Sequence, residues 1–154
     1  MRFASIREMD VTNGEGIGIA LFVQGCPFHC HNCFNKETWD FDGGKEWNDS
    51  VKEHFINLAN KEYISRISIL GGEPLSLHNI YEVINITKEL KERYPNKKIW
   101  LYSGYTYEQI LDEFPEALDY VDVLVDGMFI DELKDFNLEF RGSSNQRIIR
   151  FDKK

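Results

Sequence analysis

The chain has 154 residues, a length that suits a single domain over residues 1–154. Its hydrophobic content of 42% and aromatic content of 14% are typical of a packed globular protein and exclude a disordered chain. Lys and Arg total 18 against 26 Asp and Glu, for a formal charge of -8. This negative charge disfavours nucleic acid as a partner.

The three cysteines all lie within residues 26–33, and an odd, clustered set favours metal ligation or catalysis over a disulfide framework. The longest mainly apolar stretch, residues 17–23, is far shorter than the roughly 20 residues that a membrane helix needs. Residues 1–8 contain no apolar run followed by a small-residue cleavage site, so they do not resemble a signal peptide. We therefore expect a cytoplasmic protein without a membrane partner.

The N-terminal part predicts two strands, over residues 3–9 and 18–24, separated by the turn-forming run Asn13-Gly14-Glu15-Gly16. The cysteines follow the second strand directly. Asp49-Ser50 is then expected to cap a helix that runs to about residue 60 and carries apolar residues on one stripe.

The strand and helix pattern then repeats along the chain. The next strand stops at Gly71-Gly72, where the missing side chains release the backbone from ordinary steric limits. Thr106 with Gln109 resembles a capping box at a helix start. Further strands are expected at residues 64–70, 99–102 and 121–125, and further helices at residues 77–94 and 106–114.

Alternating strands and helices indicate an α/β fold with a mostly parallel sheet and right-handed crossovers. A closed eight-stranded barrel needs at least about 200 residues, so this shorter chain is expected to leave its sheet open on one side. Ligands of such sheets bind at the carboxyl ends of the strands. Four sequences occupy these positions: residues 26–33, 71–73, 103–104 and 126–127.

The sequence Cys26-Pro27-Phe28-His29-Cys30-His31-Asn32-Cys33 places three thiols on one loop, and cluster iron prefers such soft ligands. A cubane cluster has four iron corners, and the chain has no fourth cysteine. The alternative is a zinc site completed by His29 or His31. Zinc sites of this spacing usually add a distant second pair, which is missing here, and His54 and His78 lie on predicted helices.

The spacing of Cys26, Cys30 and Cys33 resembles the Cys-x3-Cys-x2-Cys motif of the radical SAM superfamily. The resemblance implies an open, partial (β/α) barrel and a [4Fe-4S] cluster held by these three cysteines. It also implies that S-adenosyl-L-methionine chelates the fourth iron and is cleaved to methionine and a 5'-deoxyadenosyl radical. The cofactors carry this chemistry while the protein binds and orients them, so no catalytic residue is expected beyond the cluster ligands.

The same resemblance assigns cofactor-binding residues. Most members place an aromatic residue before the third cysteine to hold the adenine, whereas this chain has Asn32, whose backbone can still bind the adenine edge. Phe34 either covers the adenine ring or belongs to the core. Gly71-Gly72-Glu73 resembles the Gly-Gly-Glu segment that receives the methionine ammonium group. The expected set is Asn32, Cys33, Phe34, Gly71, Gly72, Glu73, Ser103 and Asp126.

Over nearly its whole length the chain resembles the activating proteins of anaerobic ribonucleoside-triphosphate reductase. Matching segments are residues 13–16, 22–26, 33–39, 122–127 and 141–147. The resemblance implies that the radical takes hydrogen from a glycine Cα of the large reductase subunit and leaves a glycyl radical there. An external one-electron donor is the second expected partner.

Two other interpretations remain open at this point. The first is a different radical SAM enzyme: an activator of another glycyl-radical enzyme, of the pyruvate formate-lyase type, or a small-molecule mutase or synthase. The second is a zinc-binding module without catalysis. An open sheet favours a protein substrate, because a protein loop must reach the cluster edge.

Overall fold

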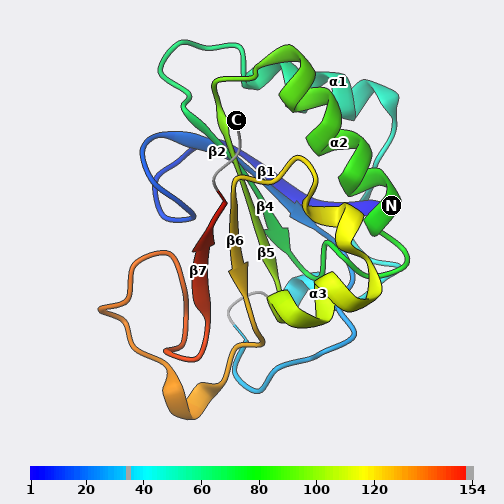
Figure 1. Cartoon of the computed structure of the whole chain (residues 1–154). Coiled ribbons are helices and arrows are strands. Elements are labelled where there is room, and N and C mark those ends of the chain that lie inside the picture. Colours follow the sequence, from blue (N-terminus) through cyan, green and yellow to red (C-terminus); the bar gives the residue numbers. More distant parts are fainter. Residues whose placement is uncertain (34–35, 152–154) are drawn as a thin grey trace.

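The computed structural model describes residues 1–33 and 36–151 as one seven-stranded sheet with helices on one side (Figure 1). The strands are β1 (Arg2–Asp10), β2 (Gly18–Val23), β3 (Lys45–Glu46), β4 (Arg66–Gly71), β5 (Lys98–Ser103), β6 (Val123–Asp126) and β7 (Arg147–Arg150). The α-helices are α1 (Asp49–Leu58), α2 (Ile80–Arg93) and α3 (Tyr107–Glu113), and short 3-10 helices are η1 (Lys36–Thr38), η2 (Pro115–Leu118) and η3 (Asp131–Leu133).

The strand order is β3-β1-β2-β4-β5-β6-β7. Strands β2, β4, β5 and β6 run parallel, while β1, β3 and β7 pair antiparallel at the two edges. The predicted α/β class with an open sheet and a parallel centre is therefore confirmed, and the assignment to a partial radical SAM barrel stays a prediction. The edge strands β3 and β7 were not predicted, because each is short and rich in charged residues.

Side chains alternate between two buried faces of the sheet. On β2, Ile19, Leu21 and Val23 join the main core under the helices, whereas Ala20 and Phe22 join a smaller cluster on the other face. Strands covered on both sides show such near-continuous burial. The helix-free face is covered by loops, and this arrangement leaves room for a cavity there.

The start of α1 differs from the prediction by one residue. Asn48 is the cap, and its side-chain oxygen accepts a backbone N–H of the first turn at 2.9 Å. Asp49 and Ser50 lie inside the helix, where the carboxylate of Asp49 favours the positive end of the helix dipole. At α3 the predicted capping box of Thr106 and Gln109 is confirmed.

Helix α2 begins at Ile80 rather than at Leu77, which is exposed. Asn79 precedes the helix but makes no side-chain cap. Its side-chain amide instead donates to the carbonyl oxygens of Gln24 and Glu73, at 3.1 and 3.0 Å. The turn before α2 is thus bonded to the ends of β2 and β4, and its Asn79 side chain does not cap the helix.

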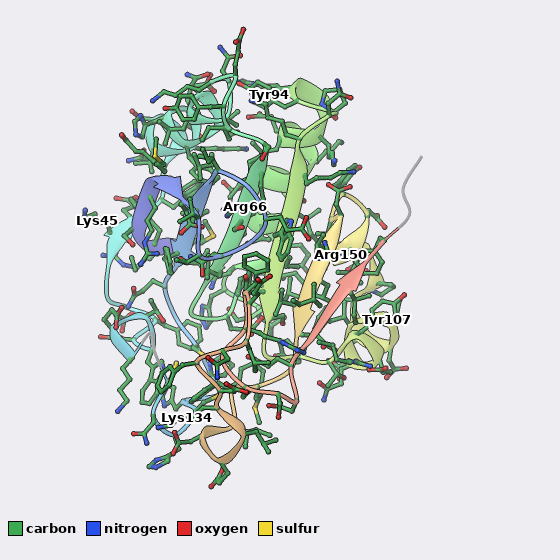
Figure 2. All side chains as sticks on the ribbon, turned by 90° about the vertical axis from the view of Figure 1, so that its left-hand side faces the viewer. Lys45, Arg66, Tyr94, Tyr107, Lys134 and Arg150 are labelled. Carbon is green, nitrogen blue, oxygen red and sulfur yellow. The ribbon has the colours of Figure 1, made fainter. Side chains whose placement is uncertain are left out.

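A buried ion pair fastens loop 11–17 over the helix-free face, and Figure 2 shows Arg66 in this region. Arg66 Nη1 lies 2.9 Å from Asp10 Oδ2, and both side chains are 1% exposed. The Arg66 guanidinium also donates to the carbonyl oxygens of Asn13 and Glu15. Burial by itself would raise the pKa of Asp10, but hydrogen bonds from Arg66 and Asn13 hold that pKa below its usual value.

Replacing Arg66 by Met should lower the free energy of unfolding by about 3–5 kcal/mol, because the Asp10 carboxylate would lose its buried cation and keep only the half-exposed Arg7, at 3.3 Å. Urea unfolding at neutral pH measures this loss. Arg93→Met is the matched control: Arg93 pairs with Glu53 at the exposed surface, so its loss should be much smaller. Equal losses in the two variants would contradict the role of the buried pair.

Candidate active site

A cavity of about 420 Å³ lies over the helix-free face, where the carboxyl ends of β2, β4, β5 and β6 meet. Its wall includes Cys26, Cys30 and Cys33, the loop residues 71–73, and residues 103–104. Its volume falls in the range of about 300–1,000 Å³ that is usual for small-molecule sites. Gly127 also lines the cavity, so all four predicted strand-end sequences contribute to it.

The cysteine loop turns sharply on leaving β2. Its backbone is left-handed at His29, with φ of 46°, and at Asn32, with φ of 55°. Cys26 is buried, whereas Cys30 and Cys33 are partly exposed, and all three face the same cavity. Within residues 1–33 and 36–151, no three His, Cys, Asp or Glu side chains are already gathered as ligands of one metal ion.

The surroundings of the thiols suit iron–sulfur ligation. Burial raises the pKa of the Cys26 thiol to about 11, against hydrogen bonds from the backbone of Phe28 and His29. Burial also raises the pKa of Cys30, against a backbone hydrogen bond from Phe129. A bound cation offsets the cost of buried thiolates, and hydrogen bonds to sulfur tune iron–sulfur clusters. The three soft donors and the backbone hydrogen bonds around them therefore fit a cluster.

Glu73 is 1% exposed and connects the ends of three strands. Its carboxylate accepts hydrogen bonds from Ser103 Oγ and the Gly104 amide, both at 2.7 Å, and from the Leu75 amide at 3.0 Å. Its own amide donates to the Gly25 carbonyl oxygen at 2.7 Å. Burial raises the pKa of Glu73 to about 7, although these hydrogen bonds to the carboxylate oppose the rise.

The two glycines before Glu73 allow the strand ends to approach closely. Gly71 has φ of 115°, and a Cβ there would lie 2.6 Å from the backbone nitrogen and oxygen of Val23. A Cβ on Gly72 would lie 2.4 Å from the Gly25 carbonyl oxygen. A side chain on either residue would push the β4 loop away from the loop that carries the cysteines.

Two predicted cofactor residues lie elsewhere or outside the described chain. Asp126 does not line the cavity: its carboxylate accepts from Arg147 Nε at 3.1 Å and from the Tyr107 amide at 2.8 Å. Its contact with a cofactor stays a prediction. Phe34 lies outside the described residues.

Ser103 lies at the cavity, whereas Asn32 is exposed and only its neighbour Cys33 lines the cavity. The side-chain amide of Asn32 donates to Asp131 Oδ2 at 3.1 Å, across 99 residues of sequence. This bond joins the cysteine loop to the segment 127–146 between β6 and β7. Ser103 lines the cavity, and its hydroxyl donates a hydrogen bond to the Glu73 carboxylate.

Part of the cavity wall carried no sequence signal. Arg7 comes from β1, and Phe140 comes from segment 127–146. Tyr102 also lines the cavity, and its buried hydroxyl has no hydrogen-bond partner among the described residues. Burial raises the pKa of this phenol. Two signals in the sequence point to Tyr102: it directly precedes the strand-end residues Ser103 and Gly104, and strand alternation on β5 places it opposite the core residue Leu101.

Comparison with known proteins first defines the class. Residues 12–149 match a family described as "4Fe-4S single cluster domain". The matched region contains the cysteine loop and all four strand ends. The chain is therefore an iron–sulfur protein of this class, and the prediction of a [4Fe-4S] cluster as its cofactor is confirmed.

The relatives define the particular family. The chain is 38% identical over 153 residues to the anaerobic ribonucleoside-triphosphate reductase-activating protein of Vibrio cholerae, covering 98% of this chain and 99% of the relative. The protein of the same name from Escherichia coli is 35% identical over 148 residues (95% and 96%), and that of Enterobacteria phage T4 is 36% identical over 148 residues (96% and 93%). The chain belongs to the family of anaerobic ribonucleoside-triphosphate reductase-activating proteins. The predicted family and enzyme class are thus confirmed.

The raised pKa of Glu73 has a measurable consequence for stability. In cluster-free protein, the free energy of unfolding should fall by up to about 3 kcal/mol as Glu73 loses its proton. This contribution is complete below pH 4.5, the usual pKa of the group, and is lost as the pH rises through about 7. Urea unfolding across this range should show the decline in wild type and not in Glu73→Gln.

Glu62→Gln is the control for this experiment, because Glu62 is exposed and should leave the wild-type slope unchanged. A Glu73→Gln variant that keeps the wild-type pH dependence would contradict the assignment of the titration to Glu73.

Proposed function

We propose that the chain activates anaerobic ribonucleoside-triphosphate reductase by generating a glycyl radical on the large reductase subunit. The observation that carries the proposal is one cavity lined by three cysteines and by residues 71–73 at the carboxyl ends of parallel strands. The names of the relatives support the reductase as the partner.

Cys26, Cys30 and Cys33 would hold the iron–sulfur cluster, and S-adenosyl-L-methionine would bind beside it in the same cavity. When bound and reduced by an external one-electron donor, the cluster supplies the electron that breaks the sulfonium–C5' bond, so that methionine and a 5'-deoxyadenosyl radical form. This chemistry would serve to take a hydrogen atom from the glycine Cα of the reductase, giving 5'-deoxyadenosine and the glycyl radical.

The chain itself binds, orients and shields the reactants. The loop of Gly71 and Gly72 has no side chain to block the methionine ammonium, and the Glu73 carboxylate adds a nearby negative charge. Ser103 acts through Glu73, to which it donates a hydrogen bond. The other proposed cofactor contacts are those of Asn32, Cys33, Phe34 and Asp126.

The size and openness of the sheet support a protein substrate. In the described part of the chain, loops and segment 127–146 cover the helix-free face and no α-helix does, so a segment of a partner protein can reach the cavity without crossing a second layer. We propose that residues 1–154 act as one radical SAM domain, because the cavity is lined by strands of a single sheet and by the loops that connect them. A reducing compartment such as the cytoplasm suits a loop that carries three cysteine thiols. Among the described residues, no helix is long and apolar enough to span a membrane.

Reconstitution tests the cofactor part of the proposal. Protein incubated anaerobically with iron and sulfide should turn brown and, once reduced, convert S-adenosyl-L-methionine to 5'-deoxyadenosine. Cys30→Ala should bind less iron and form no nucleoside, because one of three thiolate ligands is missing. Iron content and chromatography of the products measure both effects. Tightly bound zinc without any nucleoside product would overturn the proposal in favour of a zinc-binding module.

Electron paramagnetic resonance tests the partner. Reduced protein mixed with the large reductase subunit and S-adenosyl-L-methionine should produce a glycyl radical signal, and Cys30→Ala should produce none. A signal with pyruvate formate-lyase instead of the reductase would assign the chain to a different glycyl-radical enzyme.

A further inference from the structure

The segment between β6 and β7 exposes apolar side chains next to the cavity. Met128, Ile130 and Leu133 are 36–43% exposed, and Phe136 is 83% exposed. We call these four residues the apolar rim. Met128 and the neighbouring Phe129 also line the cavity, so the rim continues outward from the cavity wall.

The apolar rim is exposed although its segment is held by many hydrogen bonds. The Ser144 amide donates to the Leu133 carbonyl oxygen at 2.9 Å, and the Ile130 amide donates to Ser143 Oγ at 3.2 Å. Side chains of Asn145 and Gln146 donate to the carbonyl oxygens of residues 128 and 127. The exposure therefore belongs to an ordered segment, and ordered apolar patches beside a site mark interaction surfaces.

The rim lies beside the cysteine loop. Asp131, between two rim residues, accepts the hydrogen bond from Asn32, and the backbone of Phe129 hydrogen-bonds to the Cys30 sulfur. Figure 2 shows the segment, marked by Lys134, at the same end of the molecule as the loop that follows β2. A chain resting on the rim would thus be close to the cysteines.

The charges around the rim restrict its partner. Residues 128–139 contain four acidic side chains and one basic side chain, Lys134, which pairs with Asp131 at 3.4 Å. A second copy of this chain would bring two acidic segments together, and an anionic membrane surface would be repelled. The complementary surface is apolar with Lys or Arg side chains beside it.

We propose that the apolar rim docks the glycine-bearing segment of the large reductase subunit, through apolar side chains flanked by basic ones. This inference rests on the proposed function. The flanking residues would lie on the rim, and the glycine would enter the cavity mouth, where its lack of a side chain permits close approach. The rim would then select the partner without taking part in cofactor cleavage.

The variant Leu133→Ser/Phe136→Ser tests this inference in the reconstituted, full-length protein. Cleavage of S-adenosyl-L-methionine without reductase should stay at the wild-type rate. The dissociation constant for the large reductase subunit should rise about tenfold or more, and the glycyl radical yield at subsaturating reductase should fall accordingly. Anaerobic calorimetry and electron paramagnetic resonance provide the two readouts.

Tyr63→Ser is the matched control, because Tyr63 is 48% exposed and precedes the amino end of the central strand β4, whereas the rim follows the carboxyl end of β6. It should bind and activate the reductase as wild type does. Glu132→Lys is a second, fully surface variant that keeps the apolar residues, and it should weaken binding by repelling the basic side chains of the partner.

The possible results separate the two proposals. Wild-type affinity and radical yield in Leu133→Ser/Phe136→Ser and in Glu132→Lys would overturn the docking inference and leave the proposed function intact. Absence of a glycyl radical with the wild-type chain, despite normal cofactor cleavage, would overturn the proposed function together with the inference. Loss of binding in the rim variants, with cofactor cleavage and the Tyr63→Ser control unchanged, would support both.

Discussion

The buried carboxylate of Glu73 holds together the loops that follow three of the parallel strands. It accepts hydrogen bonds from Ser103 and Gly104 after β5, while the Glu73 amide donates to Gly25 after β2. Cys26 follows Gly25 directly, so the position of the first thiol depends on this contact. Parallel strands bring their carboxyl ends to one edge, and Glu73 converts that edge into a cavity with fixed walls. The raised pKa of Glu73 shows that its burial disfavours the charged form of the carboxyl group.

One face of the sheet carries the main hydrophobic core, and the other carries the cavity. Helices α1, α2 and α3 cover the main core on one face and keep the strand ends rigid (Figure 1). Loops cover the other face: loop 11–17, fastened by the pair of Arg66 and Asp10, and segment 127–146, bonded to the cysteine loop through Asn32. Function is commonly carried by loops on such a scaffold. The rim that we assign to the reductase therefore lies on the face where the chain has no second layer.

The predictable part of the molecule was the part encoded by local pattern. Strand alternation, the capping box of Thr106 and the glycines after β4 each reflect short-range chemistry. The alternation of strands and helices predicted that four strand ends would meet, and all four contribute residues to the cavity. Contacts between residues far apart in the sequence could not be predicted from local patterns. The pairing of β7 with β6 brings Arg147 to Asp126, and this occupies a carboxylate that the sequence favoured as a cofactor contact. Asn32 likewise finds its partner 99 residues away, which no local pattern encodes.

The central claim is that this open cavity presents a protein glycine to the 5'-deoxyadenosyl radical. Isotope transfer tests it most directly. Large reductase subunit carrying deuterium at its glycine Cα positions would be activated by the reduced, reconstituted chain, and the 5'-deoxyadenosine would be analysed by mass spectrometry. The account predicts one deuterium in the nucleoside, in proportion to the glycyl radical formed. Unlabelled 5'-deoxyadenosine beside a full glycyl radical signal would contradict it.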